Sequence, residues 1–197
     1  MRVITFNIKG ANVPGRKDHA TQKRSWQLLA AYNADLAFVQ EVQHKAIPEW
    51  ARERWSIVEV NPQTLTTKPA GWGSVIAAKP SLNLRAREDF LISHHLRLMH
   101  DYAVFGEIDL PDGSNALVSS VHAPASRLPE YLKMMGFEGF LSFDEMVAMA
   151  QPGDKPWALD LFFAEIATMV KGRRFFVGGD WNNSRLFDLH PKLRKRG

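Results

Sequence analysis

Four apolar runs in this sequence end in polar residues of types that can serve phosphate chemistry. These runs end in Thr5-Phe6-Asn7, Gln40-Glu41, Val121-His122-Ala123-Pro124 and Gly178-Gly179-Asp180-Trp181-Asn182. A hydrophobic strand places its terminal side chain rigidly at the edge of a sheet, where ligand binding and catalysis are commonly sited. The four motifs are therefore the first candidates for a functional site.

Each motif also has a simpler structural interpretation when it is taken alone. Asn7 can hydrogen-bond a turn, and Glu41 can cap a helix in solvent. A single histidine such as His122 is more often a hydrogen-bonded structural residue than a catalyst. Gly178-Gly179-Asp180 can be an ordinary tight turn. The order, spacing and neighbours of the four motifs together favour the functional interpretation.

The elements that must position these residues follow from the hydrophobic pattern. Apolar and β-branched runs predict strands at 2–8, 35–40, 56–60, 74–78, 104–110, 115–121 and 174–177. Helical spacing predicts helices at 21–33, 48–55, 128–135 and 155–170, and residues 10–18 are expected to form a loop. Pro111-Asp112-Gly113-Ser114 is typical of a hairpin turn. Strands separated by helices at both ends, with a hairpin between them, indicate two packed sheets with helices outside.

Composition limits the class of protein. The chain has 197 residues, of which 45% are hydrophobic and 23% charged, which suits a single globular domain over 1–197. It has no cysteine, so a disulfide framework and a thiolate metal site are excluded. We expect no membrane span, no signal peptide and a cytoplasmic protein. A net charge of +4 weakly favours a polyanionic partner.

The ordered series of motifs resembles that of the endonuclease/exonuclease/phosphatase superfamily. The resemblance runs from Arg2 to Asp188 and rests mainly on Gln40-Glu41 and Gly179-Asp180-Trp181-Asn182, with Gly71-Trp72-Gly73-Ser74 in support. It implies an α/β fold, a four-layer α-β-β-α sandwich of two mixed sheets. It also implies an active site across one edge of both sheets.

The resemblance also implies a role for each candidate residue. Glu41 would be the primary ligand of a hard divalent ion, Mg²⁺ or Mn²⁺, with Asn7 beside it. Asp180 would orient or deprotonate the attacking water, and Asn182 would hold the water and the phosphate in line. His122 would donate to a phosphate oxygen or assist the leaving group. Oxygen ligands without thiolates suit magnesium better than a zinc cage.

Two positions favour the deoxyribonuclease-like branch of the superfamily. Lys9 stands where abasic-site endonucleases usually have an aspartate, and His122 stands where they usually have a tyrosine. Lys9 and Arg16 could contact a nucleic-acid backbone. We therefore expect a metal-dependent hydrolase of phosphodiester bonds, an endonuclease acting on DNA. A phosphatase or sphingomyelinase-type phosphodiesterase remains an alternative.

The end of the chain departs from the superfamily pattern. Members finish with a Ser/Leu-Asp-His type motif on a strand well beyond Asn182, and Asp188-Leu189-His190 follows Asn182 too closely to supply it. We expect a domain that is truncated at the C-terminus and lacks its closing strands. Cleavage should then be weak and DNA binding stronger than cleavage, because a missing acid/base group costs about 10²–10⁴-fold in rate. A catalytically impaired nucleic-acid-binding relative is the second alternative.

Overall fold

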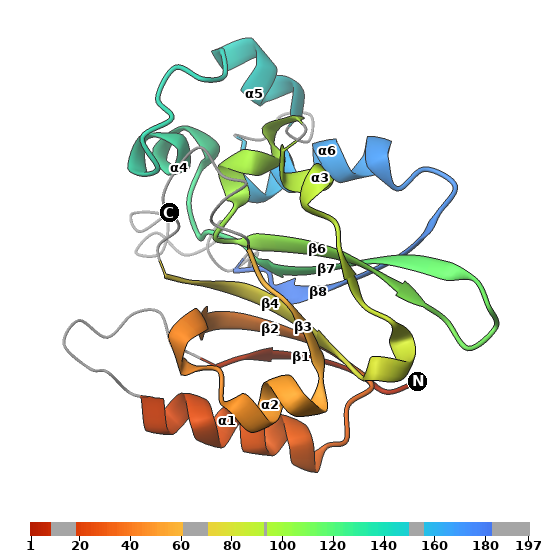
Figure 1. Cartoon of the computed structure of the whole chain (residues 1–197). Helices are drawn as coiled ribbons and strands as arrows, with labels where there is room; N and C mark the ends of the chain where they lie inside the picture. Colours follow the sequence, from red (N-terminus) through yellow and green to blue (C-terminus); the bar gives the residue numbers. More distant parts are fainter. Residues whose placement is uncertain (9–18, 61–70, 93, 150–155, 183–197) are drawn as a thin grey trace.

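Two four-stranded sheets lie face to face in the computed structural model, which describes residues 1–8, 19–60, 71–92, 94–149 and 156–182 (Figure 1). The strands are β1 (Val3–Asn7), β2 (Leu36–Gln43), β3 (Ser56–Val58), β4 (Trp72–Ala78), β5 (Arg85–Ala86), β6 (Ala103–Asp109), β7 (Asn115–His122) and β8 (Arg174–Asp180). The α-helices are α1 (His19–Ala31), α2 (Glu49–Arg54), α3 (Glu88–Ile92), α4 (Leu128–Met134), α5 (Phe143–Met149) and α6 (Ala158–Met169). Short 3₁₀ turns are η1 (His44–Ala46), η3 (Pro80–Leu82) and η4 (His94–Met99).

The first sheet has the strand order β1-β2-β4-β3, with α1 and α2 on its outer face (Figure 1). β1 and β2 are parallel, and β4 runs antiparallel to both β2 and β3. Trp26 and Leu29 of α1 are buried against this sheet together with Trp55. Their spacing is that of one helix face, so the amphipathic pattern of α1 explains its docking.

The second sheet has the order β5-β6-β7-β8, and α3, α4, α5 and α6 lie on its outer side (Figure 1). β6 and β7 form the predicted hairpin, in which Gly113 has a φ of 80°. β7 and β8 are parallel, and their register pairs His122 with Asp180. Aliphatic and aromatic side chains fill the space between the sheets, among them Phe38 and Ile76 from the first and Val118 from the second.

The expected four-layer α-β-β-α sandwich of two mixed sheets is confirmed. Two elements that the hydrophobic pattern did not predict are the short helices α3 and α5. The helix expected over 21–33 runs instead from His19 to Ala31, because Asn33 adopts a left-handed backbone with a φ of 50°. No helix among the described ranges is long and apolar enough to span a membrane.

Candidate active site

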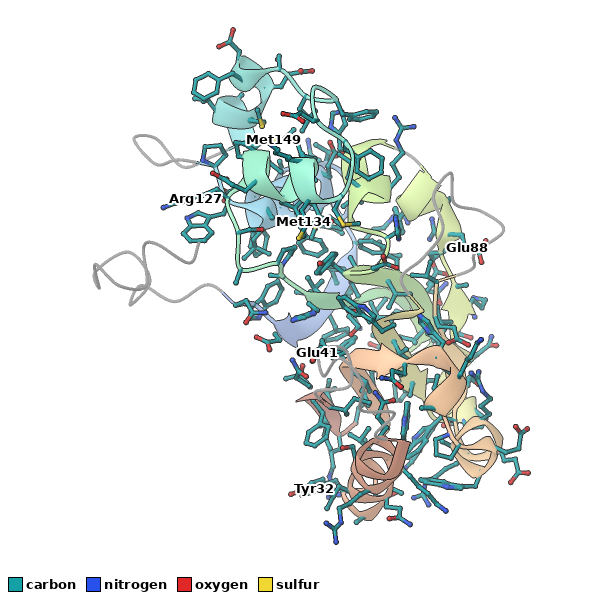
Figure 2. All side chains as sticks on the ribbon, turned by 90° about the vertical axis from the view of Figure 1, so that its left-hand side faces the viewer. Tyr32, Glu41, Glu88, Arg127, Met134 and Met149 are labelled. Atoms are coloured by element: carbon teal, nitrogen blue, oxygen red, sulfur yellow. The ribbon has the colours of Figure 1, made fainter. Side chains whose placement is uncertain are left out.

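The four predicted motifs meet at one end of the two sheets. Asn7 ends β1, His122 ends β7 and Asp180 ends β8, while Glu41 lies near the end of β2. β1 contacts β8 across the gap between the sheets. In Figure 2, Glu41 lies between the α1 side of the molecule, marked by Tyr32, and the helical layer marked by Met134. These side chains therefore lie together at one edge of both sheets, which is where the resemblance led us to expect the active site.

A single amide joins the two carboxylates of the site. Asn7 Nδ2 donates to Glu41 Oε1 at 2.9 Å and to Asp180 Oδ2 at 2.8 Å. His122 Nε2 lies 3.5 Å from Glu41 Oε1. One potential ligand atom from each of Glu41, His122 and Asp180 lies within 4.8 Å of the other two. The three groups are close enough to hold one cation.

Among the described residues, no basic side chain neutralises the two carboxylates of the site. Within the described part of the chain, no lysine or arginine forms an ion pair with Glu41 or Asp180. Their partners are the neutral amide of Asn7 and the imidazole of His122. Negative charges held this close at a partly buried edge repel one another, so a bound cation would stabilise the arrangement.

His122 is buried in an aromatic environment, and this burial favours its neutral imidazole. The ring centroid lies 6.0 Å from that of Trp72 and 5.9 Å from that of Tyr102, and the residue is 7% exposed. Burial lowers the pKa of His122, and the charges of Glu41 and Asp180 offset this effect only in part. A neutral imidazole can hydrogen-bond a phosphate oxygen or ligate a metal through one nitrogen.

An irregular turn of the backbone directs the Glu41 side chain into the site. The pairing of β2 with β4 shifts register between Val39 and Val42, and Glu41 between them has a φ of 56°. A left-handed conformation costs a residue with a Cβ about 1–3 kcal/mol and is often found at functional sites. Bulges of this kind commonly re-aim a side chain beside an active site.

Two consecutive glycines let β8 approach its neighbours closely enough to bring Asp180 to Asn7. A Cβ added to Gly178 would lie 2.2 Å from Phe38 Cδ2, and one added to Gly179 would lie 2.1 Å from the carbonyl oxygen of Val121. Both distances are far inside van der Waals contact. Gly178-Gly179 is thus part of a strand packed against the other sheet, and the alternative of a tight turn is wrong.

Asn182 lies at the site but uses its side chain to hold the adjoining loop. Its backbone N–H donates to Asp180 Oδ1 at 3.2 Å, and its Nδ2 donates to the carbonyl oxygen of Ala123 at 2.9 Å. Its φ of 43° is one that asparagine tolerates well. The contact of Asn182 with water and phosphate stays a prediction, as does that of Asn7 with a metal.

The remaining predicted residues lie outside the described part of the chain. Lys9 and Arg16 fall in the range 9–18, and Asp188 and His190 fall in the range 183–197. Their predicted roles, and the predicted loss of closing strands, therefore stay predictions.

Two buried glutamines near the site were not among the predicted site residues, although Gln40 belongs to the Gln40-Glu41 motif. Gln40 Nε2 donates to Ser120 Oγ at 3.1 Å and so links the two sheets next to Glu41. Gln22 on α1 contacts the backbone of Glu41. The sequence alone could have indicated that Gln22 is buried, because it shares the apolar helix face of Trp26 and Leu29. A polar side chain on such a face needs a hydrogen-bond partner.

Comparison with known proteins agrees with this architecture. The model of the Endonuclease/Exonuclease/phosphatase family matches residues 4–197, whereas no curated protein matches the chain in sequence. Truncated TDP2 of Caenorhabditis elegans superposes with a TM-score of 0.55 at 18% identity, covering 92% of this chain and 62% of that one.

Two other solved structures share the fold. The endonuclease domain of TRAS1, a telomere-specific non-LTR retrotransposon, has a TM-score of 0.53 at 16% identity over 94% of this chain and 62% of that one. ANGEL2, a 2′,3′-cyclic phosphatase, has a TM-score of 0.54 at 14% identity, covering 98% of this chain and 56% of that one. The chain thus spans less than two thirds of the length of each of these three structures. With its sheets, its site edge and a family match over nearly all of its residues, the chain belongs to the endonuclease/exonuclease/phosphatase family.

Proposed function

We propose that the chain is a divalent-metal-dependent hydrolase of phosphodiester bonds and that its substrate is DNA. The observation that carries the proposal is the cluster of Glu41, Asp180 and His122, whose potential ligand atoms lie within 4.8 Å of one another. Phosphodiester hydrolysis needs positive charge beside the phosphate, a group that orients water and a donor for the leaving oxygen. The cluster can supply or recruit each of these.

The side chains present fit a hard divalent cation. Glu41 and Asp180 offer carboxylate oxygens, and none of the described arginines or lysines competes for them. This oxygen-rich set suits Mg²⁺ or Mn²⁺. When bound, such an ion polarises a phosphate oxygen and neutralises charge that develops during hydrolysis.

The chain's own residues would position the reactants. Asp180 is oriented at both carboxylate oxygens, by Asn7 Nδ2 on one and the Asn182 backbone N–H on the other. A carboxylate held in this way can accept a proton from the attacking water. His122, which packs against the contacting rings of Trp72 and Tyr102, would donate a hydrogen bond to a phosphate oxygen or to the leaving oxygen.

DNA is the substrate that the available observations favour. The net charge of +4 suits a polyanion, and Lys9 and Arg16 are placed by the sequence close to the Asn7 motif. Among the proteins that share the fold, the TRAS1 domain is an endonuclease. ANGEL2, a 2′,3′-cyclic phosphatase, shows that the same fold also serves a different phosphoester, so that class belongs in the test.

The proposal can be tested with supercoiled plasmid, bis(p-nitrophenyl) phosphate and a 2′,3′-cyclic nucleotide, each assayed with Mg²⁺, Mn²⁺ or EDTA. We expect weak plasmid nicking that requires metal and falls about 10²–10⁴-fold in Asp180→Asn. Asp112→Asn, which alters an exposed carboxylate at the opposite end of the second sheet, should leave nicking unchanged.

The other outcomes of this experiment contradict the proposal in distinct ways. Salt-sensitive DNA binding without nicking would favour a nucleic-acid-binding role over catalysis. Turnover of the cyclic nucleotide alone would assign a different substrate. Nicking that survives both EDTA and Asp180→Asn would remove this site from the reaction.

A further inference from the structure

One side chain of α1 contacts the backbone of β2 at two points, at Glu41 and at Gln43. Gln22 Nε2 donates to the carbonyl oxygen of Glu41 at 3.2 Å, and the backbone N–H of Gln43 donates to Gln22 Oε1 at 3.2 Å. Gln22 is 1% exposed. A single buried amide thus forms a two-point clamp on the strand segment that carries the candidate metal ligand.

The clamp lies where the strand ladder is interrupted. Val39 pairs with Val75 and Val42 pairs with Gly73, but the register shift leaves Glu41 without a pairing partner in β4. Glu41 has a φ of 56°, a conformation that persists only when the surroundings enforce it. On the β1 side the ladder ends at Gln40, whose carbonyl oxygen accepts from the Ile8 N–H. Beyond that point the Gln22 amide adds two bonds to the backbone of Glu41 and Gln43.

We propose that Gln22 is a positioning residue that holds the Glu41 bulge in the conformation needed to bind a divalent cation. The inference rests on the proposed function only in assigning a metal to Glu41. If the segment relaxed to a regular strand, the Glu41 carboxylate would leave Asn7 and His122, since a one-residue change of register turns a side chain to the other face. The cation would then lose one of its two carboxylates.

The side-chain amide of a glutamine matches both contacts at this position. The carbonyl oxygen of Glu41 requires a donor and the N–H of Gln43 requires an acceptor, and a side-chain amide offers one of each. A methionine would fill the same space with neither bond, and a glutamate would keep the acceptor but lose the donor. Trp26 and Leu29, buried on the same helix face, fix the helix from which Gln22 extends.

The test compares Gln22→Met, Gln22→Glu and Gln27→Met, the last being a matched control at an exposed position of the same helix. Two quantities are measured: the Kd for Mn²⁺ alone, and hydrogen exchange of the Gln43 amide relative to Val118 in the middle of β7. We expect Gln22→Met to raise the Kd about 10–100-fold, as loss of an outer-shell partner does. It should also accelerate exchange at Gln43 but not at Val118.

Gln22→Glu should preserve Gln43 protection, because its carboxyl still accepts from that N–H. Gln27→Met should change neither quantity. An unchanged Kd and unchanged Gln43 exchange in folded Gln22→Met would overturn the inference, and so would equal acceleration at Gln43 and Val118, which would indicate general destabilisation. If the wild-type chain binds no Mn²⁺, the proposed metal function fails, and Gln43 exchange alone decides whether Gln22 holds the bulge.

Discussion

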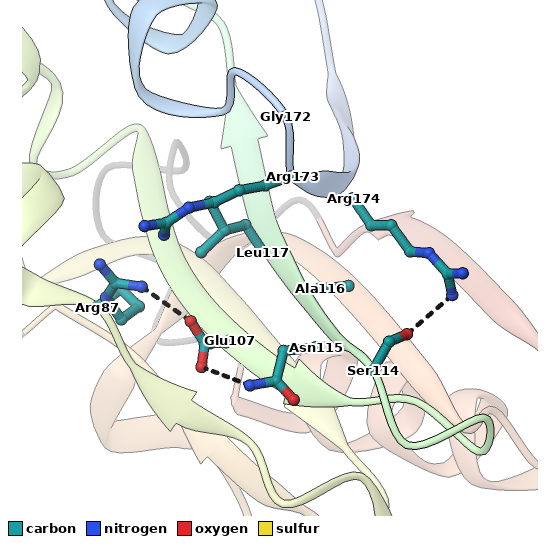
Figure 3. A pocket seen from close by; sticks show the side chains of 9 residues that line it. All are labelled: Arg87, Glu107, Ser114, Asn115, Ala116, Leu117, Gly172, Arg173 and Arg174. Atoms are coloured by element: carbon teal, nitrogen blue, oxygen red, sulfur yellow. Dashed lines mark hydrogen bonds and ion pairs between the residues drawn. The ribbon is translucent and has the colours of Figure 1, made fainter.

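The two ends of the β7–β8 strand pair use carboxylates in opposite ways. At the end where the strands begin, a pocket of about 450 Å³ is lined by Arg87, Arg173 and Arg174 together with Glu107 and Asn115 (Figure 3). There Glu107 pairs with two arginines, and Arg174 pairs with Asp112. At the other end, Glu41 and Asp180 share only the amide of Asn7 and the nearby imidazole.

Carboxylates at the pocket end form ion pairs with arginines and so have a structural use, whereas those at the site end are available for a functional one. The ion pairs at the pocket end, which are exposed or only partly buried, neutralise their carboxylates locally. Exposed pairs of this kind contribute little to stability. At the site end, two partly buried carboxylates have no lysine or arginine partner in the part of the chain that the structure describes, and a bulge and two glycines shape the backbone there. Acidic residues left without a basic partner beside such a backbone indicate a site prepared for an external cation.

The largest difference between the two ends should appear in metal binding. Glu41→Gln removes one anionic ligand without changing its size and should weaken Mn²⁺ binding at least about 10-fold. Glu107→Gln makes the same change among arginines and should leave Mn²⁺ affinity unaltered. Calorimetric titration with Mn²⁺ measures the affinity of both variants. Similar affinities for the two would show that the two ends do not differ in metal binding.

An intermediate effect, on the stability of the fold, is expected from changes at Gly178, where the two sheets pack closely beside the site. Gly178→Ala would place a methyl group 2.2 Å from the Phe38 ring and should lower the free energy of unfolding by about 1–3 kcal/mol. Gly106→Ala, in the same sheet, meets first the flexible end of Leu84 at 2.9 Å and should cost less.

Urea unfolding of both glycine variants tests this order. Adding Phe38→Leu should recover part of the loss in Gly178→Ala if the ring is the obstacle. If Gly178→Ala and Gly106→Ala lower the free energy of unfolding equally, the close contact of Gly178 with Phe38 does not constrain the separation of the sheets.

The smallest expected effect is on how the stability contributed by Asp112, at the pocket end, depends on pH. Hydrogen bonds from Ser114 and Arg174 hold the pKa of the Asp112 carboxyl well below its usual range. A carboxyl with a lowered folded-state pKa adds stability that is present above its unfolded pKa of about 4 and is lost as pH falls through the folded value.

The unfolding midpoint of Asp112→Asn should therefore lie slightly below that of the wild type at neutral pH and converge with it in acid. Thermal unfolding from neutral pH down to strongly acidic pH, with both chains in the same buffers, measures this convergence. A constant difference at all pH values would mean that the Asp112 charge is not responsible.

Local sequence determined much of the fold and the identity of the candidate residues. Asn7, His122 and Asp180 end apolar runs, and such runs form strands whatever they pack against. The turn at Gly113 likewise follows from nearby residues, as does the amphipathic face of α1. The short helices α3 and α5 carry too few periodic positions to be separated from loop by pattern alone.

Only the tertiary structure decided how these residues act together. Asn7 and Asp180 are far apart in the chain, and their hydrogen bond depends on the separation of two sheets, which Gly178 sets by its contact with Phe38. The left-handed conformation of Glu41 is unfavourable for its residue type, so no local propensity could predict it. It exists because a bulge in β2 and a glutamine from a separate helix stabilise it, and such stabilisation is a property of packing.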